Sequence, residues 1–167
     1  MTRVVGLDLS LTRPGICSTT GVAWSYATPD LRGVQRLIHL RDYVLEHTLH
    51  VDLVVVEDYA FAQAKAAHKI GELHGVVRVA LAEADRCFVP VAPTARAKYA
   101  TGKGNAKKSE VVSAWSARTG IPFDGDDACD AHILRAMALD HYGEREVVVP
   151  ETHRVALKNV IWPRLAA

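Results

Sequence analysis

The chain has 167 residues, of which 49% are hydrophobic and 23% charged, and its net charge is +1. This length suits one compact domain with one core, and the composition excludes a disordered or fibrous chain. No apolar run approaches the ~18 residues that a membrane-spanning helix needs. The first residues carry no signal-peptide pattern and the three cysteines have no paired spacing, so we expect free thiols and a cytoplasmic location.

The first third of the chain predicts two strands, a helix and a third strand. Residues 4–7 are typical of a buried strand that ends at Asp8, and a turn-rich loop leads to a second strand near residues 21–26. Apolar residues at a period close to 3.6 predict a helix over residues 33–49. Residues 52–57 form a continuous apolar run that ends at Glu57, as in strands buried on both faces of an α/β sheet.

The rest of the chain alternates helix and strand. The predicted elements are a long helix over residues 62–84, a strand over 87–91, a short helix after Pro93, a helix from about Lys108 and a helix over 127–141. This order indicates a layered α/β domain with a mixed sheet over residues 1–143. Residues 144–167 form a tail of unassigned role, with a strand-like run at 147–149 and a helix at 151–161.

Four acidic residues stand where packing alone would favour other residue types. Asp8 and Glu57 end the two buried strands, and ligands of α/β sheets gather at strand ends, although either acid could simply face solvent there. Asp127 and Asp130 are three residues apart, so they share one helical face, which continues into the apolar core. Asp127 could equally stabilise the helix N-terminus.

If these four carboxylates converge, they need cations. Two unit charges ~4 Å apart repel by roughly 4 kcal/mol at an effective dielectric near 20. Oxygen ligands suit Mg²⁺ or Mn²⁺ rather than Zn²⁺, and no histidine or cysteine has zinc spacing. Four carboxylates can hold two metal ions ~3.5–4 Å apart, the arrangement that hydrolyses phosphodiester bonds.

The basic residues gather in one stretch. Between Ala92 and Arg118 there are six cations and one acid, so the rest of the chain is net acidic. A local basic surface is typical of a protein that binds the phosphate backbone, although a solvated helix face is an equally good interpretation. The residues that we expect to contact DNA in this stretch are Arg96, Lys98, Lys103, Lys107 and Lys108.

Five segments resemble, in order and spacing, the RuvC-type Holliday junction resolvases of the RNase H-like superfamily. They are GLDLS at 6–10, VVVEDYAF at 54–61, KIGELHGVV at 69–77, ATGKGNAKKSEV at 100–111 and DACDAHILRAMAL at 127–139. The resemblance covers residues 3–142 and is greatest to the phage-encoded branch. It implies an RNase H-like nuclease domain, a homodimer, and nicking of two opposed strands of a four-way junction with ligatable ends.

The resemblance also implies residue roles. The metal-binding acids of the family fall on Asp8, Glu57, Asp127 and Asp130, and its basic DNA contacts fall on Lys98 and on Lys108, beside the scissile phosphate. Either Tyr59 or Phe61 matches the aromatic residue that enters the junction centre. If the protein is phage-encoded, its location is the host cytoplasm.

The sequence departs from the family in the sheet. The third strand of an RNase H-like sheet is expected near residues 27–35, where Pro29 interrupts a short segment, so this strand is predicted to be abbreviated or lost. Among the histidines, we interpret His132 as a surface residue, and His68 and His74 as partner-facing or solvated.

Three other functions remain open from sequence. The first is a different RNase H-like nuclease activity, such as RNA processing, at the same acids. The second is an actin-like ATP-binding domain, for which 167 residues are few and a second phosphate loop is missing. The third is a DNA-binding module without catalysis, which the presence of all four acids disfavours.

Overall fold

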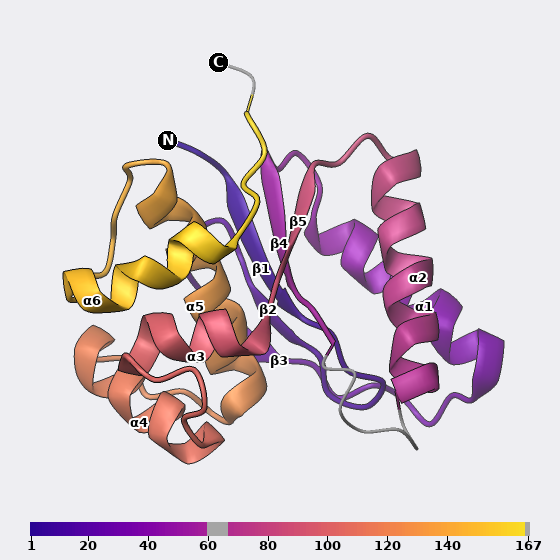
Figure 1. The fold of residues 1–167 in the computed structure, drawn as a ribbon. Coiled ribbons are helices and arrows are strands. Elements are labelled where there is room, and N and C mark those ends of the chain that lie inside the picture. Colours follow the sequence, from indigo (N-terminus) through magenta and orange to yellow (C-terminus); the bar gives the residue numbers. More distant parts are fainter. Residues whose placement is uncertain (60–66, 166–167) are drawn as a thin grey trace.

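The computed structural model describes residues 1–59 and 67–165, which form a five-stranded mixed sheet between two layers of helices (Figure 1). The strand order is β3-β2-β1-β4-β5. The strands are β1 (Val4–Asp8), β2 (Gly15–Cys17), β3 (Ala23–Ser25), β4 (Leu53–Glu57) and β5 (Phe88–Val91). β1, β4 and β5 are parallel, whereas β2 and β3 are antiparallel to their neighbours. The predicted α/β fold with a mixed sheet is confirmed.

The sheet differs from the prediction at its β3 edge. The sequence placed a loop where β2 lies, and it placed the second strand where β3 lies. Residues 27–32 contain no strand, so the third strand is abbreviated to three residues and lies earlier in the chain than expected. Strands of three residues carry too few side chains to show an alternating pattern, which is why the sequence did not separate them.

The predicted helices are all present, with small shifts at their ends. They are α1 (Gly33–His47), α2 (Ala67–Glu83), α3 (Pro93–Thr101), α4 (Lys108–Thr119), α5 (Asp126–His141) and the short α6 (Glu151–Arg154), which continues as a 3-10 helix over Val155–Asn159. The start predicted for the long helix, residues 62–66, lies outside the described residues. In the part of the chain that the structure describes, no helix has the length and apolarity to span a membrane.

Alternating side chains of β1 and β4 build two separate cores. Val4 and Val55 face the layer of α3, α4 and α5, whereas Val5 and Val54 face the layer of α1 and α2. Figure 1 shows these layers on opposite sides of the sheet. Because both faces are covered, the central strands are apolar on every side, as the continuous run at residues 52–57 predicted.

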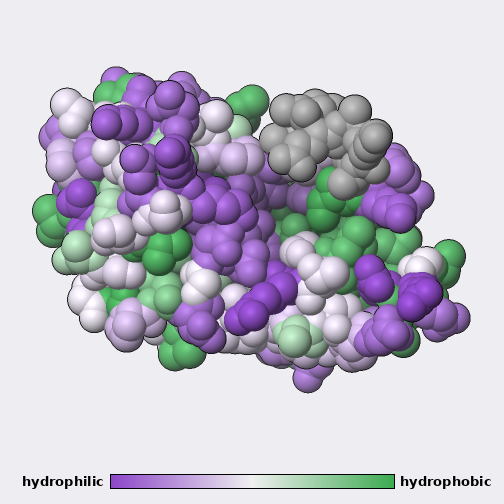
Figure 2. All heavy atoms as spheres, turned by 90° about the horizontal axis from the view of Figure 1, so that it is seen from below, coloured by the Kyte–Doolittle hydropathy of each residue, from purple (hydrophilic) through white to green (hydrophobic). Residues whose placement is uncertain are grey.

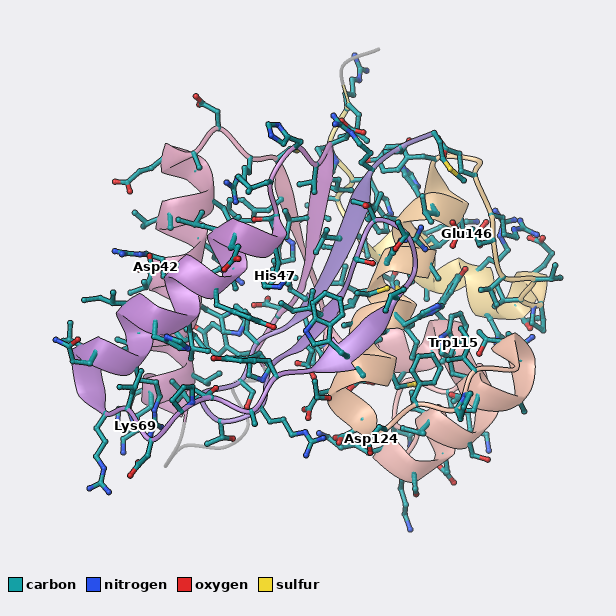
Figure 3. All side chains as sticks on the ribbon, turned by 180° about the vertical axis from the view of Figure 1, so that it is seen from behind. Asp42, His47, Lys69, Trp115, Asp124 and Glu146 are labelled. Carbon is teal, nitrogen blue, oxygen red and sulfur yellow. The ribbon has the colours of Figure 1, made fainter. Side chains whose placement is uncertain are left out.

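The histidines of these cores correct two predictions. His132 was expected on the surface, but it is 4% exposed, and its Nδ1 accepts a hydrogen bond from Trp115 Nε1 at 3.0 Å. Figure 3 shows Trp115 within the layer of α3, α4 and α5. His74 was expected to face solvent or a partner, but it is 2% exposed and packs against the ring of Tyr59. His68 is exposed, in agreement with its prediction.

The tail packs onto the domain. Ala156 and Leu157 are buried in the same core as α5, and Arg154 Nε donates to Asp140 Oδ2 at 2.9 Å. The strand-like run predicted at residues 147–149 is not a strand: it pairs with none of the five strands, and the backbone oxygen of Val148 accepts a hydrogen bond from Arg118 of α4 instead. Of the three consecutive valines, Val149 is buried in the core, whereas Val148 is 77% exposed. The division of the chain at residue 143 stays a prediction.

Candidate active site

Two acidic side chains lie side by side at one edge of the sheet. Asp8 is the last residue of β1 and Glu57 is the last residue of β4. The strands are parallel with Leu7 opposite Val56, so their carboxyl ends are adjacent. Figure 2 looks onto this end of the molecule, where hydrophilic residues extend into the hollow between the two helical layers. Ligands of α/β proteins bind at such an edge.

Helix α5 reaches this edge because two glycines of the sheet face it. A Cβ atom on Gly6 would lie 2.0 Å from the backbone oxygen of Ala131, and one on Gly15 would lie 2.0 Å from that of Asp127. Any side chain at these two positions would push the helix away. The close approach brings the first turns of α5, including Asp130, to the end of β1.

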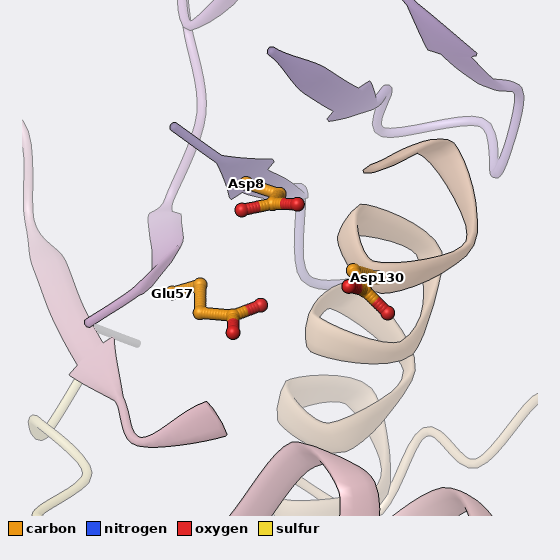
Figure 4. Close-up of side chains that lie close together, drawn as sticks. All are labelled: Asp8, Glu57 and Asp130. Atoms are coloured by element: carbon orange, nitrogen blue, oxygen red, sulfur yellow. The ribbon is translucent and has the colours of Figure 1, made fainter. Parts of the chain in front are cut away.

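Asp8, Glu57 and Asp130 form a cluster, which we call the acidic triad. Each contributes a carboxylate oxygen, and the three oxygens lie within 4.8 Å of one another. Figure 4 shows the carboxylates of β1, β4 and α5 directed into one space. The structure therefore brings together three of the four acids that the sequence singled out. A cation between them would offset a mutual repulsion of several kcal/mol, on the order estimated for charges ~4 Å apart.

Burial and crowding raise the pKa values of the acidic triad. The pKa of Asp8 lies well above its usual value, first because the carboxylate is desolvated and then because Glu57 and Asp130 lie nearby. Burial raises the pKa of Asp130 to about 7, although the positive charge of Arg96 acts in the opposite direction. Burial also raises the pKa of Glu57. The charged forms of these acids therefore need further positive charge close by.

Arg96 lies inside the acidic triad. Its side chain is 7% exposed, and its Nε lies 2.8 Å from Oε2 of Glu57. Its Nη2 donates to Oε1 of Glu57 at 3.2 Å, and its Nη1 donates to Asp130. The sequence placed Arg96 among the DNA-contacting residues of a basic surface, whereas the structure places its guanidinium among buried carboxylates. Ala95, Ala97, Tyr99 and Ala100 are buried as well, so α3 is enclosed on several sides and its two basic residues do not share one solvent-facing stripe.

The donor set suits a hard divalent cation. Oε2 of Glu57 is buried and, among the described residues, has no aligned hydrogen-bond donor, although Nε of Arg96 lies nearby. Carboxylate oxygens are the ligands that Mg²⁺, Mn²⁺ and Ca²⁺ prefer. The residues present therefore fit a divalent cation, which Asp8, Glu57 and Asp130 could hold together.

Asp127 lies beside the acidic triad without belonging to it. It is the second residue of α5, and it lines a cavity of about 640 Å³ together with Asp8 and Glu57. Burial and the neighbouring Asp126 raise its pKa. Its role as a fourth metal ligand stays a prediction.

Of the four lysines predicted to bind DNA, all of them among the described residues, Lys108 is the one that lines the cavity beside the acidic triad. It begins α4 and donates a hydrogen bond to Asp126, which raises the pKa of the lysine. Lys107 and Lys103 are exposed on the loop between α3 and α4, and Lys98 is half-buried on α3. Their contacts with DNA stay predictions.

Of the two aromatic candidates, the structure describes Tyr59. Tyr59 lines the cavity, and its ring centre lies 5.1 Å from that of His74. Phe61 lies outside the described residues. The choice between them as the residue that enters a junction therefore stays open.

Two residues beside the site were not predicted. Asp126 holds the ammonium group of Lys108, and its position next to Asp127 at a helix start was the available signal. Arg13 lies in the loop after β1, with its Nε 3.9 Å from Oδ2 of Asp127. Arg13 is a single basic residue in a turn-rich loop, so no sequence pattern singled it out.

Comparison with known proteins decides the family. No protein-family model matches the chain. The crossover junction endodeoxyribonuclease RuvC of Rhizobium leguminosarum bv. trifolii (strain WSM2304) is 30% identical over 156 residues, which cover 86% of this chain and 90% of that protein. The chain belongs to the RuvC family. The actin-like alternative is therefore wrong.

Solved RuvC structures share this fold. The T. thermophilus RuvC in complex with Holliday junction substrate matches with a TM-score of 0.67 at 22% identity, over 89% of this chain and 100% of that one. The Thermus thermophilus RuvC structure matches with a TM-score of 0.63, also at 22% identity, over 87% and 99% of the two chains. The greater similarity to phage-encoded RuvC proteins stays a prediction.

Proposed function

We propose that this RuvC family member is a structure-selective endodeoxyribonuclease that cleaves Holliday junctions or other branched DNA by metal-dependent hydrolysis. The acidic triad carries this proposal, because it joins the partly buried carboxylates of Asp8 and Glu57 with the buried carboxylate of Asp130 beside a cavity that Lys108 also lines. A phosphodiester would be repelled by these carboxylates unless cations lay between them.

We propose that Mg²⁺ is the natural metal, that Mn²⁺ can replace it, and that two ions bind. Asp8 would serve both ions, since its carboxylate lies close to those of both Glu57 and Asp130, and Asp127 would complete the ligand set. When bound, the ions supply the positive charge that activates water and stabilises the leaving oxygen. The carboxylates would hold the ions, and their own negative charge would keep phosphate oxygens of the DNA from contacting them directly.

The lysines have a separate task in this proposal. Asp126 holds the Lys108 ammonium at the rim of the cavity, where it would neutralise the scissile phosphate. Lys98, Lys103 and Lys107 would bind phosphates further along the strand, and Tyr59 or Phe61 would enter the junction. Contacts of this kind position the DNA and do not read its sequence.

Assembly and location complete the proposal. A homodimer would place two copies of the acidic triad on a junction that has two-fold symmetry. The absence of paired cysteine spacing supports a cytoplasmic location, which would be that of the host if the protein is phage-encoded.

The proposal is tested with a panel of substrates of equal length. Purified protein is incubated with a four-way DNA junction, a flap, a plain duplex and an RNA–DNA hybrid, each with Mg²⁺, Mn²⁺, Ca²⁺ or EDTA. We expect cleavage of the junction with Mg²⁺ or Mn²⁺, and binding without efficient cleavage with Ca²⁺. Preferred cleavage of the RNA strand would favour the RNA-processing alternative, and full activity in EDTA would overturn the metal mechanism.

A further inference from the structure

The guanidinium of Arg96 contacts two of the three carboxylates that are proposed to bind metal, Glu57 and Asp130. Arg96 extends from α3 and engages both oxygens of Glu57 as well as Asp130, and all three side chains are largely buried. An arginine that served only to bind DNA would have no reason to lie 7% exposed between two carboxylates. Its position indicates that Arg96 helps to hold Glu57 and Asp130 in place.

The charges explain what this arginine does before metal binds. With its three carboxylates ionised and Arg96 protonated, the site carries a net charge of −2, against −3 without the arginine. Buried like charges at these distances are unfavourable, and breaking a buried ion pair leaves its partner without compensation. Arg96 therefore supplies the positive charge that allows Glu57 and Asp130 to lie together in the folded chain.

We propose that Arg96 is a positioning residue that assembles the acidic triad in advance and competes with the divalent cation for Glu57 and Asp130. This inference rests on the proposed metal-dependent function. Arg96 and the cation are attracted to the same oxygens and repel each other. The chain therefore folds without metal, and it binds metal more weakly than its carboxylates alone would.

Two opposite effects follow for Arg96→Gln. Without metal the variant is less stable than the wild type, because Glu57 and Asp130 lose their cation. With metal its affinity is higher, because a positive charge close to the ion has been removed. Even at the dielectric constant of water, a unit charge ~5 Å from a divalent ion changes its binding by about tenfold or more. A residue with a merely structural role would give the first effect without the second.

The experiment measures Mn²⁺ affinity and stability in parallel. Free Mn²⁺ is followed by electron paramagnetic resonance during titration of the wild type, Arg96→Gln and Arg96→Lys. Thermal unfolding is recorded in EDTA and in saturating Mn²⁺. We expect Arg96→Gln to bind Mn²⁺ about tenfold or more tightly than the wild type, and to unfold at a lower temperature in EDTA only. Arg96→Lys keeps the charge, so its Mn²⁺ affinity should stay closer to that of the wild type.

Arg135 provides the matched control. Arg135 lies on α5, as Asp130 does, but outside the acidic triad. Its side chain is 3% exposed and forms an ion pair with Glu146. Arg135→Gln should lower the unfolding temperature equally in EDTA and in Mn²⁺ and leave the Mn²⁺ affinity unchanged.

Several results would overturn the inference. An Mn²⁺ affinity of Arg96→Gln that is equal to or weaker than that of the wild type contradicts the competition. A variant that is unfolded in EDTA and stays unfolded in saturating Mn²⁺ assigns Arg96 to packing. If Arg96→Gln leaves the Mn²⁺ affinity unchanged but weakens junction binding and makes that binding less dependent on salt, the role of Arg96 is to contact DNA.

Asp8→Asn separates this inference from the proposed function. If Asp8→Asn weakens Mn²⁺ binding but Arg96→Gln does not strengthen it, only the role of Arg96 fails. If the wild type and Asp8→Asn bind Mn²⁺ alike, the acidic triad is not the metal site, and the proposed function fails with the inference.

Discussion

Asp8 and Asp130 are held in an environment that disfavours their charged forms. Both carboxylates are desolvated, and each lies near other acids of the site, so both pKa values are raised. A raised carboxyl pKa means that the ionised group destabilises the folded state above the pKa of the unfolded chain. Such groups persist at functional sites because binding requires them.

Replacement of either acid by its amide should separate catalysis from binding. We expect Asp8→Asn, and separately Asp130→Asn, to abolish cleavage of a four-way junction while junction binding is largely retained, because these acids hold metal and not DNA. Asp8→Asn should also unfold at a higher temperature in EDTA, because it removes a crowded charge without changing the shape of the side chain. Gel assays of cleavage and binding test this, and a variant that cleaves within threefold of the wild type would remove that residue from the site.

His132 should make stability depend on pH. Burial lowers its pKa from 6.5 to about 4, and Arg135 adds to the shift. The unfolded chain therefore binds a proton below pH 6.5 that the folded chain does not bind until about pH 4, so stability is lost as the pH falls through this range. The free energy of unfolding should drop by about 2 kcal/mol from this residue between pH 7 and pH 5.

Urea unfolding of the wild type and His132→Gln at both pH values checks this prediction. The glutamine removes the titrating group while keeping an acceptor for Trp115 Nε1. His74 has a similarly lowered pKa and remains in the variant, so its contribution cancels in the comparison. Equal losses of stability in the two proteins between pH 7 and pH 5 would show that His132 does not contribute.

The elements that sequence predicts well are those with long or continuous apolar patterns. The helix at residues 33–49 and the run at 52–57 appear as α1 and β4 because their periodicity reflects burial. The strand predicted near residues 21–26 appears as β3, whereas β2 was missed, because its three residues show no local pattern and its position is decided by pairing with β1 and β3. The valines at 147–149 failed as a strand for the same reason, since no edge of the sheet receives them.

The candidate site shows the same division. The acids at the ends of β1 and β4 were predicted as candidates because they interrupt apolar runs, and the structure brings Asp8, Glu57 and Asp130 together. The inward direction of Arg96 was not predicted, because a basic stretch shows charge along the chain but not which face of α3 each residue occupies. Only the packing of α3 against α5 determines that face.

The two lysines at the start of α4 should contribute to DNA binding and not to the stability of the fold. Lys107 and Lys108 are exposed residues at this helix start. We expect Lys107→Ala and Lys108→Ala each to reduce the log–log salt slope of junction binding by about one unit, because one phosphate contact is lost. Lys108→Ala should also slow cleavage more than it weakens binding, because Lys108 lines the cavity of the acidic triad.

A salt titration of junction affinity, single-turnover cleavage and a thermal melt together test the lysines. Lys158→Ala is the control, since Lys158 is exposed on the tail and does not line this cavity. An unchanged salt slope with a lowered unfolding temperature would mean that Lys107 and Lys108 support the fold instead.

The molecule as a whole should form a homodimer through the outer face of α2. A Cβ atom on Gly75 would meet nothing within 4 Å, and Val79, one turn further, is 57% exposed. A small residue and an apolar one on a solvent-facing stripe permit close approach of a second helix. We expect light scattering to give the mass of a dimer at micromolar concentration, and Val79→Glu to shift it toward the monomer. A wild-type monomer with and without junction DNA would contradict this.

The acidic triad and the proposed dimer together require two nicks placed symmetrically on a branched substrate. The direct measurement is cleavage of an immobile four-way junction labelled in turn on each strand, with Mg²⁺, followed by treatment with DNA ligase. We expect nicks in two opposed strands at equivalent distances from the branch point, religation of the ends, and no product with Asp8→Asn. Equal cleavage of the plain duplex, or nicks that Asp8→Asn still produces, would contradict the assignment of this site to junction resolution.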